Sequence, residues 1–185
     1  MSKRVLNKLA GEIRVCAKCP LCESRTNAVP GDGKATAEIM VIGEAPGRRE
    51  DEKGIPFVGA AGKFLDKVLQ GVKLDRQDLF ITNIVKCRPP KNRPPKRMEV
   101  ETCTSNYLFE QIKQIEPKLI MLLGGTAAKA VLGITKVGDA RGKVINQDGR
   151  KYIVGYHPAY AFRKRELIPE VENDFKLFKR EIGKL

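Results

Sequence analysis

Apolar residues gather in four short runs along the chain, and these runs predict the strands of a buried sheet. Each run is rich in β-branched, aromatic or long aliphatic residues and ends near Gly, Pro or polar residues. Such continuous apolar runs favour strands that are buried on both faces, as in a parallel sheet. The predicted strands are residues 38–43, 79–87, 118–124 and 151–155, the last being the second arm of a hairpin over 143–155 that turns at Asp148-Gly149.

Between these runs, apolar residues recur at the spacing of a helix with one buried face. The pattern predicts helices over residues 3–15, 60–71, 96–116 and 169–182, and a short helix that ends at Leu132 with Thr126 as its N-cap. The Gly- and Pro-rich residues 25–37 are expected to form a loop. Strands that alternate with helices predict a single three-layer α/β/α domain over residues 1–185, around a central, largely parallel four-stranded sheet.

Residues suited to chemistry stand at or near the ends of these strands. Asn83 interrupts an apolar run, and a buried amide needs hydrogen-bond partners, which a strand end facing a pocket can supply. The first strand runs into the turn GEAPG at 43–47, whose glycines let backbone N–H groups approach a ligand closely. His157, the only histidine, follows the fourth strand. Ligand-binding sites form at the carboxyl ends of parallel strands, so these residues predict such a site. The alternative is that Asn83 is a core residue with all its hydrogen bonds made and that His157 has a structural role.

Charge indicates the class of partner. The net charge is +13 and the pI is about 9.7, which indicates a polyanionic partner, with nucleic acid as the first choice. The alternative is that the basic charge reflects a generally lysine-rich proteome. The segment 86–97 holds six basic residues and four prolines, a composition that suits a loop following phosphates or, equally, a solvated surface loop.

Location and source are also suggested by composition. No apolar run approaches the length of a membrane span, and no apolar segment follows Lys3 and Arg4 as in a secretory signal. We therefore expect a cytoplasmic, nucleoid-associated protein. The absence of Trp and the 31% of charged residues lean towards a thermophile, whereas five cysteines argue the other way.

Five motifs stand in order along the chain: GEAPG at 43–47, PFVG at 56–59, ITN at 81–83, KCRPP at 86–90 and HPAY at 157–160. Together they resemble the family 4 uracil-DNA glycosylases, the iron–sulfur members of their superfamily. The resemblance covers nearly the whole chain, from Cys16 to the last helix. It implies a monofunctional enzyme that flips uracil out of double- or single-stranded DNA and hydrolyses its N-glycosidic bond in base excision repair. It also implies a monomer and leaves a sliding clamp open as a partner.

The cysteines match the same family pattern of a CxxC pair followed, after a long gap, by two further cysteines. By spacing alone, four thiolates suit zinc or a [4Fe–4S] cluster equally. The resemblance decides for the [4Fe–4S] cluster and leaves Cys22 as a spare thiol. Its ligands would be Cys16, Cys19, Cys87 and Cys103.

The resemblance also assigns residues to the uracil. Phe57 matches the aromatic that stacks on the base, and Asn83 the amide that pairs with its edge. Glu50 stands where the family blocks the thymine methyl group at C5; the alternative is a solvated carboxylate. His157 matches the catalytic histidine near O2, where a donor stabilises the negative charge of the leaving base.

The turn after the first strand completes the expected pocket. The resemblance places Gly43 and Ala45 against the uracil. Family 1 enzymes carry an Asp where this chain has Ala45, so no obvious general base exists, and Glu44 or the backbone would place the attacking water.

Basic and aromatic residues are expected to hold the DNA. Tyr160 or Phe162 would fill the hole left by the flipped base, and the sequence does not choose between them. Phosphate contacts are expected from Lys86, Arg88, Lys91, Arg93, Arg163 and Lys164, with Arg165 beside them.

Two other functions compete with this prediction. One is a non-catalytic DNA-binding module of the same fold, stapled by a metal. The other is a redox sensor whose cluster is the active part.

Overall fold

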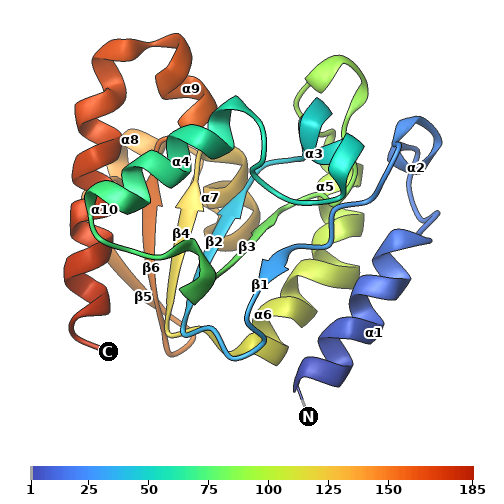
Figure 1. The fold of residues 1–185 in the computed structure, drawn as a ribbon, viewed down its shortest axis with the longest axis horizontal. Coiled ribbons are helices and arrows are strands. Elements are labelled where there is room, and N and C mark those ends of the chain that lie inside the picture. Colours follow the sequence, from blue (N-terminus) through green and yellow to red (C-terminus); the bar gives the residue numbers. More distant parts are fainter. Residues whose placement is uncertain (1) are drawn as a thin grey trace.

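Six strands form the sheet at the centre of the computed structural model, which describes residues 2–185 (Figure 1). Their order is β1-β3-β2-β4-β6-β5, and the inner four run parallel as predicted. The predicted number of four strands is too small, because β1 and β5 add an antiparallel strand at each edge. The predicted hairpin is confirmed as β5 and β6. The strands are β1 (Asp32–Gly33), β2 (Ile39–Gly43), β3 (Leu79–Asn83), β4 (Leu119–Leu123), β5 (Val144–Gln147) and β6 (Arg150–Gly155).

Helices cover both faces of this sheet, so the three-layer prediction is confirmed (Figure 1). One face packs against α1 (Ser2–Arg14), α6 (Phe109–Ile115) and α7 (Gly125–Leu132). The other packs against α4 (Ala60–Gly71), α9 (Pro158–Arg163) and α10 (Ile168–Ile182). Alternate residues of β2 and β4 enter the two cores, which explains why these strands are apolar without interruption.

Several short elements were not predicted. The segment 25–37, predicted to be a loop, contains β1, which pairs antiparallel with β3. The charged residues after GEAPG form α3 (Arg48–Lys53), and the HPAY motif begins α9. The remaining short elements are α2 (Leu21–Ser24), α8 (Val137–Ala140), η1 (Arg76–Asp78), η2 (Pro90–Asn92) and η4 (Arg165–Leu167).

The helix predicted over residues 96–116 is divided into α5 (Arg97–Cys103), a π-helical turn (Thr104–Leu108) and α6. Three consecutive polar side chains in this turn donate to carbonyls one turn earlier. Such bonds compete for the carbonyls of the regular helix and favour its local widening.

Thr126 is not the N-cap that the sequence suggested. Gly124 occupies that position with φ +90°, and Thr126 lies inside the first turn of α7. A left-handed φ favours glycine, which explains why the Gly-Gly pair precedes the helix.

The strand order places a crevice beside β2. The chain passes from β2 to β3 on one side and later returns to β4 on the other, and the helices that follow β2 and β3 lie on opposite faces of the sheet. Such a switch point is where ligands bind in open α/β sheets. Among the described residues, no helix combines the length and apolar character needed to cross a membrane.

Candidate active site

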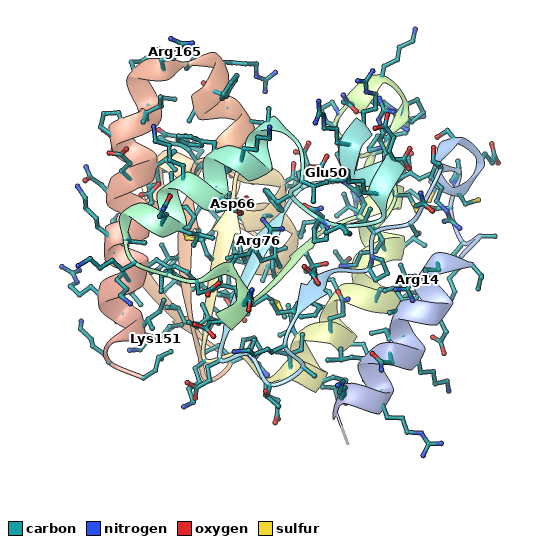
Figure 2. The ribbon with its side chains drawn as sticks, viewed as in Figure 1. Arg14, Glu50, Asp66, Arg76, Lys151 and Arg165 are labelled. Carbon is teal, nitrogen blue, oxygen red and sulfur yellow. The ribbon has the colours of Figure 1, made fainter. Side chains whose placement is uncertain are left out.

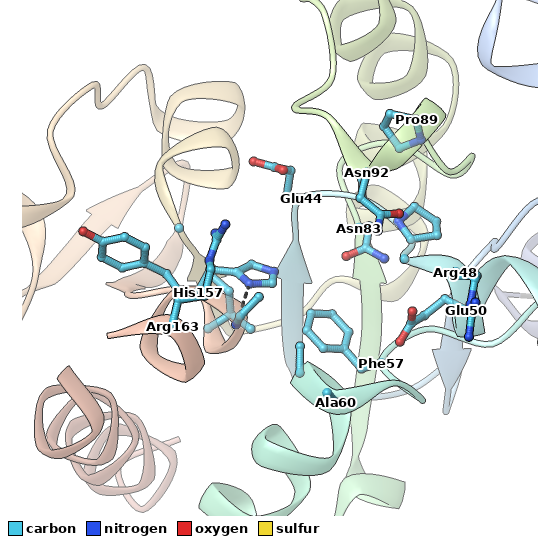
Figure 3. A pocket seen from close by; sticks show the side chains of 18 of the residues that line it. Glu44, Arg48, Glu50, Phe57, Ala60, Asn83, Pro89, Asn92, His157 and Arg163 are labelled. Carbon is cyan, nitrogen blue, oxygen red and sulfur yellow. Dashed lines mark hydrogen bonds between the residues drawn. The ribbon is translucent and has the colours of Figure 1, made fainter. Parts of the chain in front are cut away.

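A cavity of about 690 Å³ opens at the carboxyl ends of β2, β3, β4 and β6 (Figure 3). Among the residues that line it are five of those predicted to bind uracil, namely Ala45, Glu50, Phe57, Asn83 and His157. Segments far apart in the sequence therefore meet at one site.

Gly43 is not among the residues that line the cavity, so its predicted contact with uracil stays a prediction. It is the last residue of β2 and pairs with Asn83 of β3. A Cβ at this position would lie 2.5 Å from both Asn83 Oδ1 and Phe57 Cζ. The absence of a side chain is what lets the amide and the aromatic ring approach each other.

Asn83 presents an unsatisfied hydrogen-bond acceptor in the cavity. Asn83 is 2% exposed, and its Oδ1 is the only buried side-chain N or O atom without a partner among the side chains that the structure describes, residues 3–185. Leaving a buried acceptor unpaired costs about 1–3 kcal/mol. A ligand that donates an N–H to Oδ1 would remove this cost.

Phe57 is buried beside Asn83 in a left-handed backbone conformation with φ +51°. Arg76, labelled in Figure 2, holds it by donating to the carbonyls of Pro56 at 2.6 Å and Phe57 at 3.2 Å, and it pairs with Asp66 at 2.8 Å. Gly62 of α4 makes room, since a Cβ there would lie 1.9 Å from the Phe57 oxygen. The unfavourable backbone of Phe57 is therefore fixed by its surroundings.

Glu50 is buried in α3, so the alternative of a solvated carboxylate is wrong. Its Oε1 accepts the backbone N–H groups of Val58 at 2.9 Å and Gly59 at 2.7 Å. These are unpaired donors at the start of α4, where a negative charge is favourable. Glu50 thus fixes the loop that carries Phe57, while its predicted contact with C5 of a base stays a prediction.

His157 is the N-cap of α9, and its ring lies next to Phe57, with 5.9 Å between ring centroids and 27° between planes. Nδ1 accepts the backbone N–H of Ala159 at 3.1 Å, drawn as a dashed line in Figure 3. Desolvation, helped by the positive charge of Arg163, lowers the pKa of His157 to about 4, although Glu50 opposes the shift. Near pH 7 the ring is therefore neutral and carries its proton on Nε2 as a hydrogen-bond donor.

Glu44 lines the cavity and links two elements. Its Oε2 accepts a hydrogen bond from Thr126 Oγ1 at 2.5 Å, which joins the end of β2 to the first turn of α7. Glu44 and Glu50 are the two acidic residues that line the cavity within the described chain. Because Glu50 already binds two backbone donors, Glu44 is the carboxylate better placed to accept a proton.

Positive charge surrounds the cavity, and two of the residues predicted to contact phosphate have partners within the protein. Lys86 is 1% exposed and its ammonium points into the core, so it does not reach a phosphate. Arg93 lines the cavity but donates twice to the buried carboxylate of Glu99, at 2.6 and 2.8 Å, so a phosphate would have to compete with this ion pair. Arg48 and Arg49, which were not predicted as site residues, line the cavity from α3.

The other predicted phosphate contacts remain at the surface. Arg163 lines the cavity, Lys91 and Lys164 are exposed, and Arg88 is partly exposed and donates to Asn92 at 2.7 Å. Lys164 lies 5.5 Å from the centre of the Tyr160 ring.

The two aromatic residues predicted to fill the hole left by a flipped base lie in different places. Tyr160 lines the cavity and is 37% exposed. Phe162 is 58% exposed and lines a separate groove between α4 and α10. Tyr160 is therefore the aromatic that stands at the mouth of the cavity.

The four predicted cluster ligands come from three segments: the turn after α1, the end of the β3 region and the last residue of α5. The thiols of Cys87 and Cys103 are buried. Donors already point at three of the sulfurs: Arg25 Nη1 to Cys87 at 3.1 Å, the Lys86 N–H to Cys103 at 3.3 Å and the Lys18 N–H to Cys16 at 3.5 Å.

The thiols also influence one another. Burial raises the pKa of Cys103 to about 11; the charge and backbone N–H of Lys86 oppose this shift, and the charges of Cys87 and Cys19 add to it. Within residues 2–185, however, no three His, Cys, Asp or Glu side chains are arranged to hold one metal ion. Four cysteine thiols are a donor set that suits either one zinc ion or a [4Fe–4S] cluster.

Comparison with known proteins gives a consistent result. Residues 30–182 match the family model "Uracil DNA glycosylase superfamily". A type-4 uracil-DNA glycosylase of Pyrobaculum aerophilum is 45% identical, over 94% of this chain and 92% of its own. The corresponding proteins of Archaeoglobus fulgidus (44%, over 97% and 94%) and Thermotoga maritima (36%, over 97% of both) are also similar. The chain therefore belongs to the uracil-DNA glycosylase superfamily and, within it, to the type-4 uracil-DNA glycosylases.

Proposed function

We propose that this protein is a monofunctional uracil-DNA glycosylase that binds a flipped uracil in the cavity and hydrolyses its N-glycosidic bond. The observation that carries the proposal is the unpaired Oδ1 of Asn83, beside the ring of Phe57 and near the N–H donor of His157. A planar base with one N–H and two carbonyl groups is the ligand that this set of groups complements.

Asn83 supplies recognition. Its Oδ1 accepts N3–H of uracil while its NH₂ group donates to O4. Cytosine has an unprotonated N3 and an amino group at position 4, so both contacts would become repulsive. The ring of Phe57 stacks on the base, which must leave the duplex to reach the cavity.

His157 supplies stabilisation of the leaving group. As the bond from C1′ to N1 breaks, the electron pair stays on uracil and its charge spreads to O2. The neutral imidazole donates its Nε2–H to that oxygen and needs no change of tautomer, because Ala159 already occupies Nδ1.

Glu44 is proposed to place the water that attacks C1′ and to accept its proton as the new C–O bond forms. Thr126 orients this carboxylate, which supports the assignment because an oriented base needs no rearrangement during reaction. The product is an abasic site, and the excised uracil leaves as a free base.

The four cysteines are proposed to hold a [4Fe–4S] cluster. When bound, it would supply covalent links between Cys16 and Cys19 after α1, Cys87 after β3 and Cys103 of α5. Its place is therefore beside the strand that carries Asn83, and its contribution to the protein is folding free energy.

DNA is proposed to lie across the mouth of the cavity. Tyr160 fills the space left by the flipped base, and its position at the mouth supports this choice over Phe162. The phosphate contacts come from Arg48, Arg49, Arg88, Lys91, Arg163 and Lys164.

The test is excision from oligonucleotides that carry U·G, U·A, T·G or C·G pairs, with wild type and Asn83→Ala side by side. We expect excision from both uracil substrates, none from T·G or C·G, and a large loss in the variant. DNA binding without excision of uracil would support the non-catalytic module instead. Activity that follows the oxidation state of the cluster would support the redox sensor.

A further inference from the structure

Lys86 is a buried ammonium group to which the proposed mechanism gives no role. It is among the largest fully buried side chains of the protein. Its Nζ donates to Thr82 Oγ1 at 2.7 Å, to the backbone oxygen of Asn83 at 2.8 Å and to Gln111 Oε1 at 2.7 Å. All three acceptors are neutral, and no carboxylate forms an ion pair with Lys86 among the described residues. A buried lysine without an acidic partner is unfavourable by itself.

The backbone oxygen of Asn83 lies where the sheet stops. Pairing between β1 and β3 ends at Ile81, and pairing between β2 and β3 ends at the Gly43–Asn83 pair. Asn83 is nevertheless almost fully buried. A buried carbonyl at this position needs a donor from outside the sheet, and the Lys86 ammonium is that donor.

Lys86 is itself held by the surrounding structure. Gln111 Nε2 and Thr82 Oγ1 both donate to the backbone oxygen of Pro30, at 2.7 and 3.0 Å. The Lys86 carbonyl accepts the Val29 N–H at 2.7 Å. The ammonium therefore ties the Asn83 peptide to α6 and to the segment before β1.

We propose that Lys86 is a positioning residue for base recognition: by holding the Asn83 peptide, it aims the Asn83 amide at the base. The inference rests on the proposed function, in which Asn83 reads uracil. Backbone and side chain of Asn83 share one Cα, so a peptide that turns by a small angle moves the amide away from its hydrogen-bonding geometry. Misplacement of about 1 Å at a reacting centre can reduce the rate about 100-fold.

The experiment is a double-mutant cycle of Lys86→Met and Asn83→Ala, measured as single-turnover excision of uracil. Methionine matches the length of lysine but cannot donate. Asn83→Ala keeps the backbone oxygen that Lys86 holds and removes only the amide. A purely structural role of Lys86 therefore predicts equal effects in both backgrounds, whereas positioning predicts an effect only where the amide is present.

We expect Lys86→Met to lower kcat/KM by about 10- to 100-fold in the wild-type background, and by less than about twofold with Asn83→Ala. Inhibition by free uracil should weaken in parallel. If Asn83→Ala itself has no effect, the proposed reading role fails. The inference about Lys86 alone fails in two cases, both with Asn83→Ala impaired. In the first, Lys86→Met excises uracil normally. In the second, Lys86→Met lowers excision by the same factor with and without the Asn83 amide.

A second, isosteric variant guards against misfolding of Lys86→Met. Thr82→Val removes one acceptor of the ammonium and should reduce excision in the same direction by a smaller factor, again only when Asn83 is present. Thr104→Val, at the other buried threonine, is the matched control and should leave excision unchanged. Normal excision by a folded Thr82→Val, together with a Lys86→Met that does not fold, would overturn the proposal.

Discussion

The protonation state of His157 is the most sharply testable feature of the site, because the protein contains one histidine. The pKa of this ring lies at about 4, against an ordinary value of 6.5, chiefly because the site is desolvated and Arg163 is near. The unfolded chain therefore binds a proton between pH 6.5 and pH 4 that the folded protein does not bind. Within this window the stability must fall as the pH falls.

The magnitude follows from the same two pKa values. A shift of about 2.5 pKa units corresponds to about 3 kcal/mol when the pH is below both values. Between pH 7 and pH 5, the site alone should reduce the free energy of unfolding by about 2 kcal/mol. His157→Asn cannot titrate, so the difference in pH dependence between wild type and this variant isolates the contribution.

Two measurements check this prediction. Denaturant unfolding of both proteins at pH 7 and pH 5 should give the difference of about 2 kcal/mol. Nitrogen-15 NMR of the single ring should show a protonated Nε2 and an unprotonated Nδ1 down to pH 5. A ring that titrates near its ordinary pKa, or parallel pH dependence of the two proteins, would refute both the neutral ring and the donor role assigned to Nε2.

Three further outcomes follow from the structure. Glu44→Gln should slow single-turnover excision by about 100-fold or more while binding of uracil-containing DNA is unchanged, because the amide cannot accept a proton; equal activity would remove Glu44 from the mechanism. Cys87→Ser should lose the visible absorbance of the cluster and destabilise the fold, whereas Cys22→Ser should keep the absorbance and the stability of the wild type. Stoichiometric zinc without iron in anaerobically prepared protein would contradict the cluster itself. Arg93→Ala should lower the free energy of unfolding, because Glu99 stays buried without its partner, yet leave the salt dependence of DNA binding unchanged. A shallower slope would show that Arg93 contacts phosphate after all.

Much of the fold could be predicted from the sequence because the inner strands are buried on both faces. A run such as residues 118–124 has no polar face and no helical period, so its identity as a core strand is readable locally. The edge strand β1 is two residues long and carries no such pattern. It forms because β3 offers free backbone groups to a passing segment, which is a property of the assembled sheet.

The site was predictable to the extent that its residues stand in motifs at strand ends, as Asn83 and His157 do. The residues that support them carry no comparable signal. Lys86 was predicted to contact phosphate because it borders a basic, proline-rich segment, and its burial depends on acceptors that only the fold brings together. Arg76 lies 19 residues from Phe57 in the sequence, in a stretch that nothing marks as functional.

Three separate sets of hydrogen bonds hold the three groups that would touch a base. Asn83 is fixed through Lys86, Phe57 through Arg76, and His157 through Ala159. These hydrogen bonds involve backbone atoms or His157 Nδ1, so Asn83 Oδ1 and His157 Nε2 stay available to a base.

The missing hydrogen bond to Asn83 Oδ1 makes the protein less stable, and the same missing bond is a source of selectivity. The unpaired Oδ1 of Asn83 costs about 1–3 kcal/mol, which corresponds to about 5- to 150-fold in an equilibrium constant. A base with an N–H at position 3 recovers this free energy on binding, whereas cytosine, which lacks that proton, leaves the acceptor unpaired and brings its own N3 lone pair towards it. Discrimination between uracil and cytosine therefore needs no clash built against cytosine. It follows from holding one acceptor still, in a place where only the correct base can satisfy it.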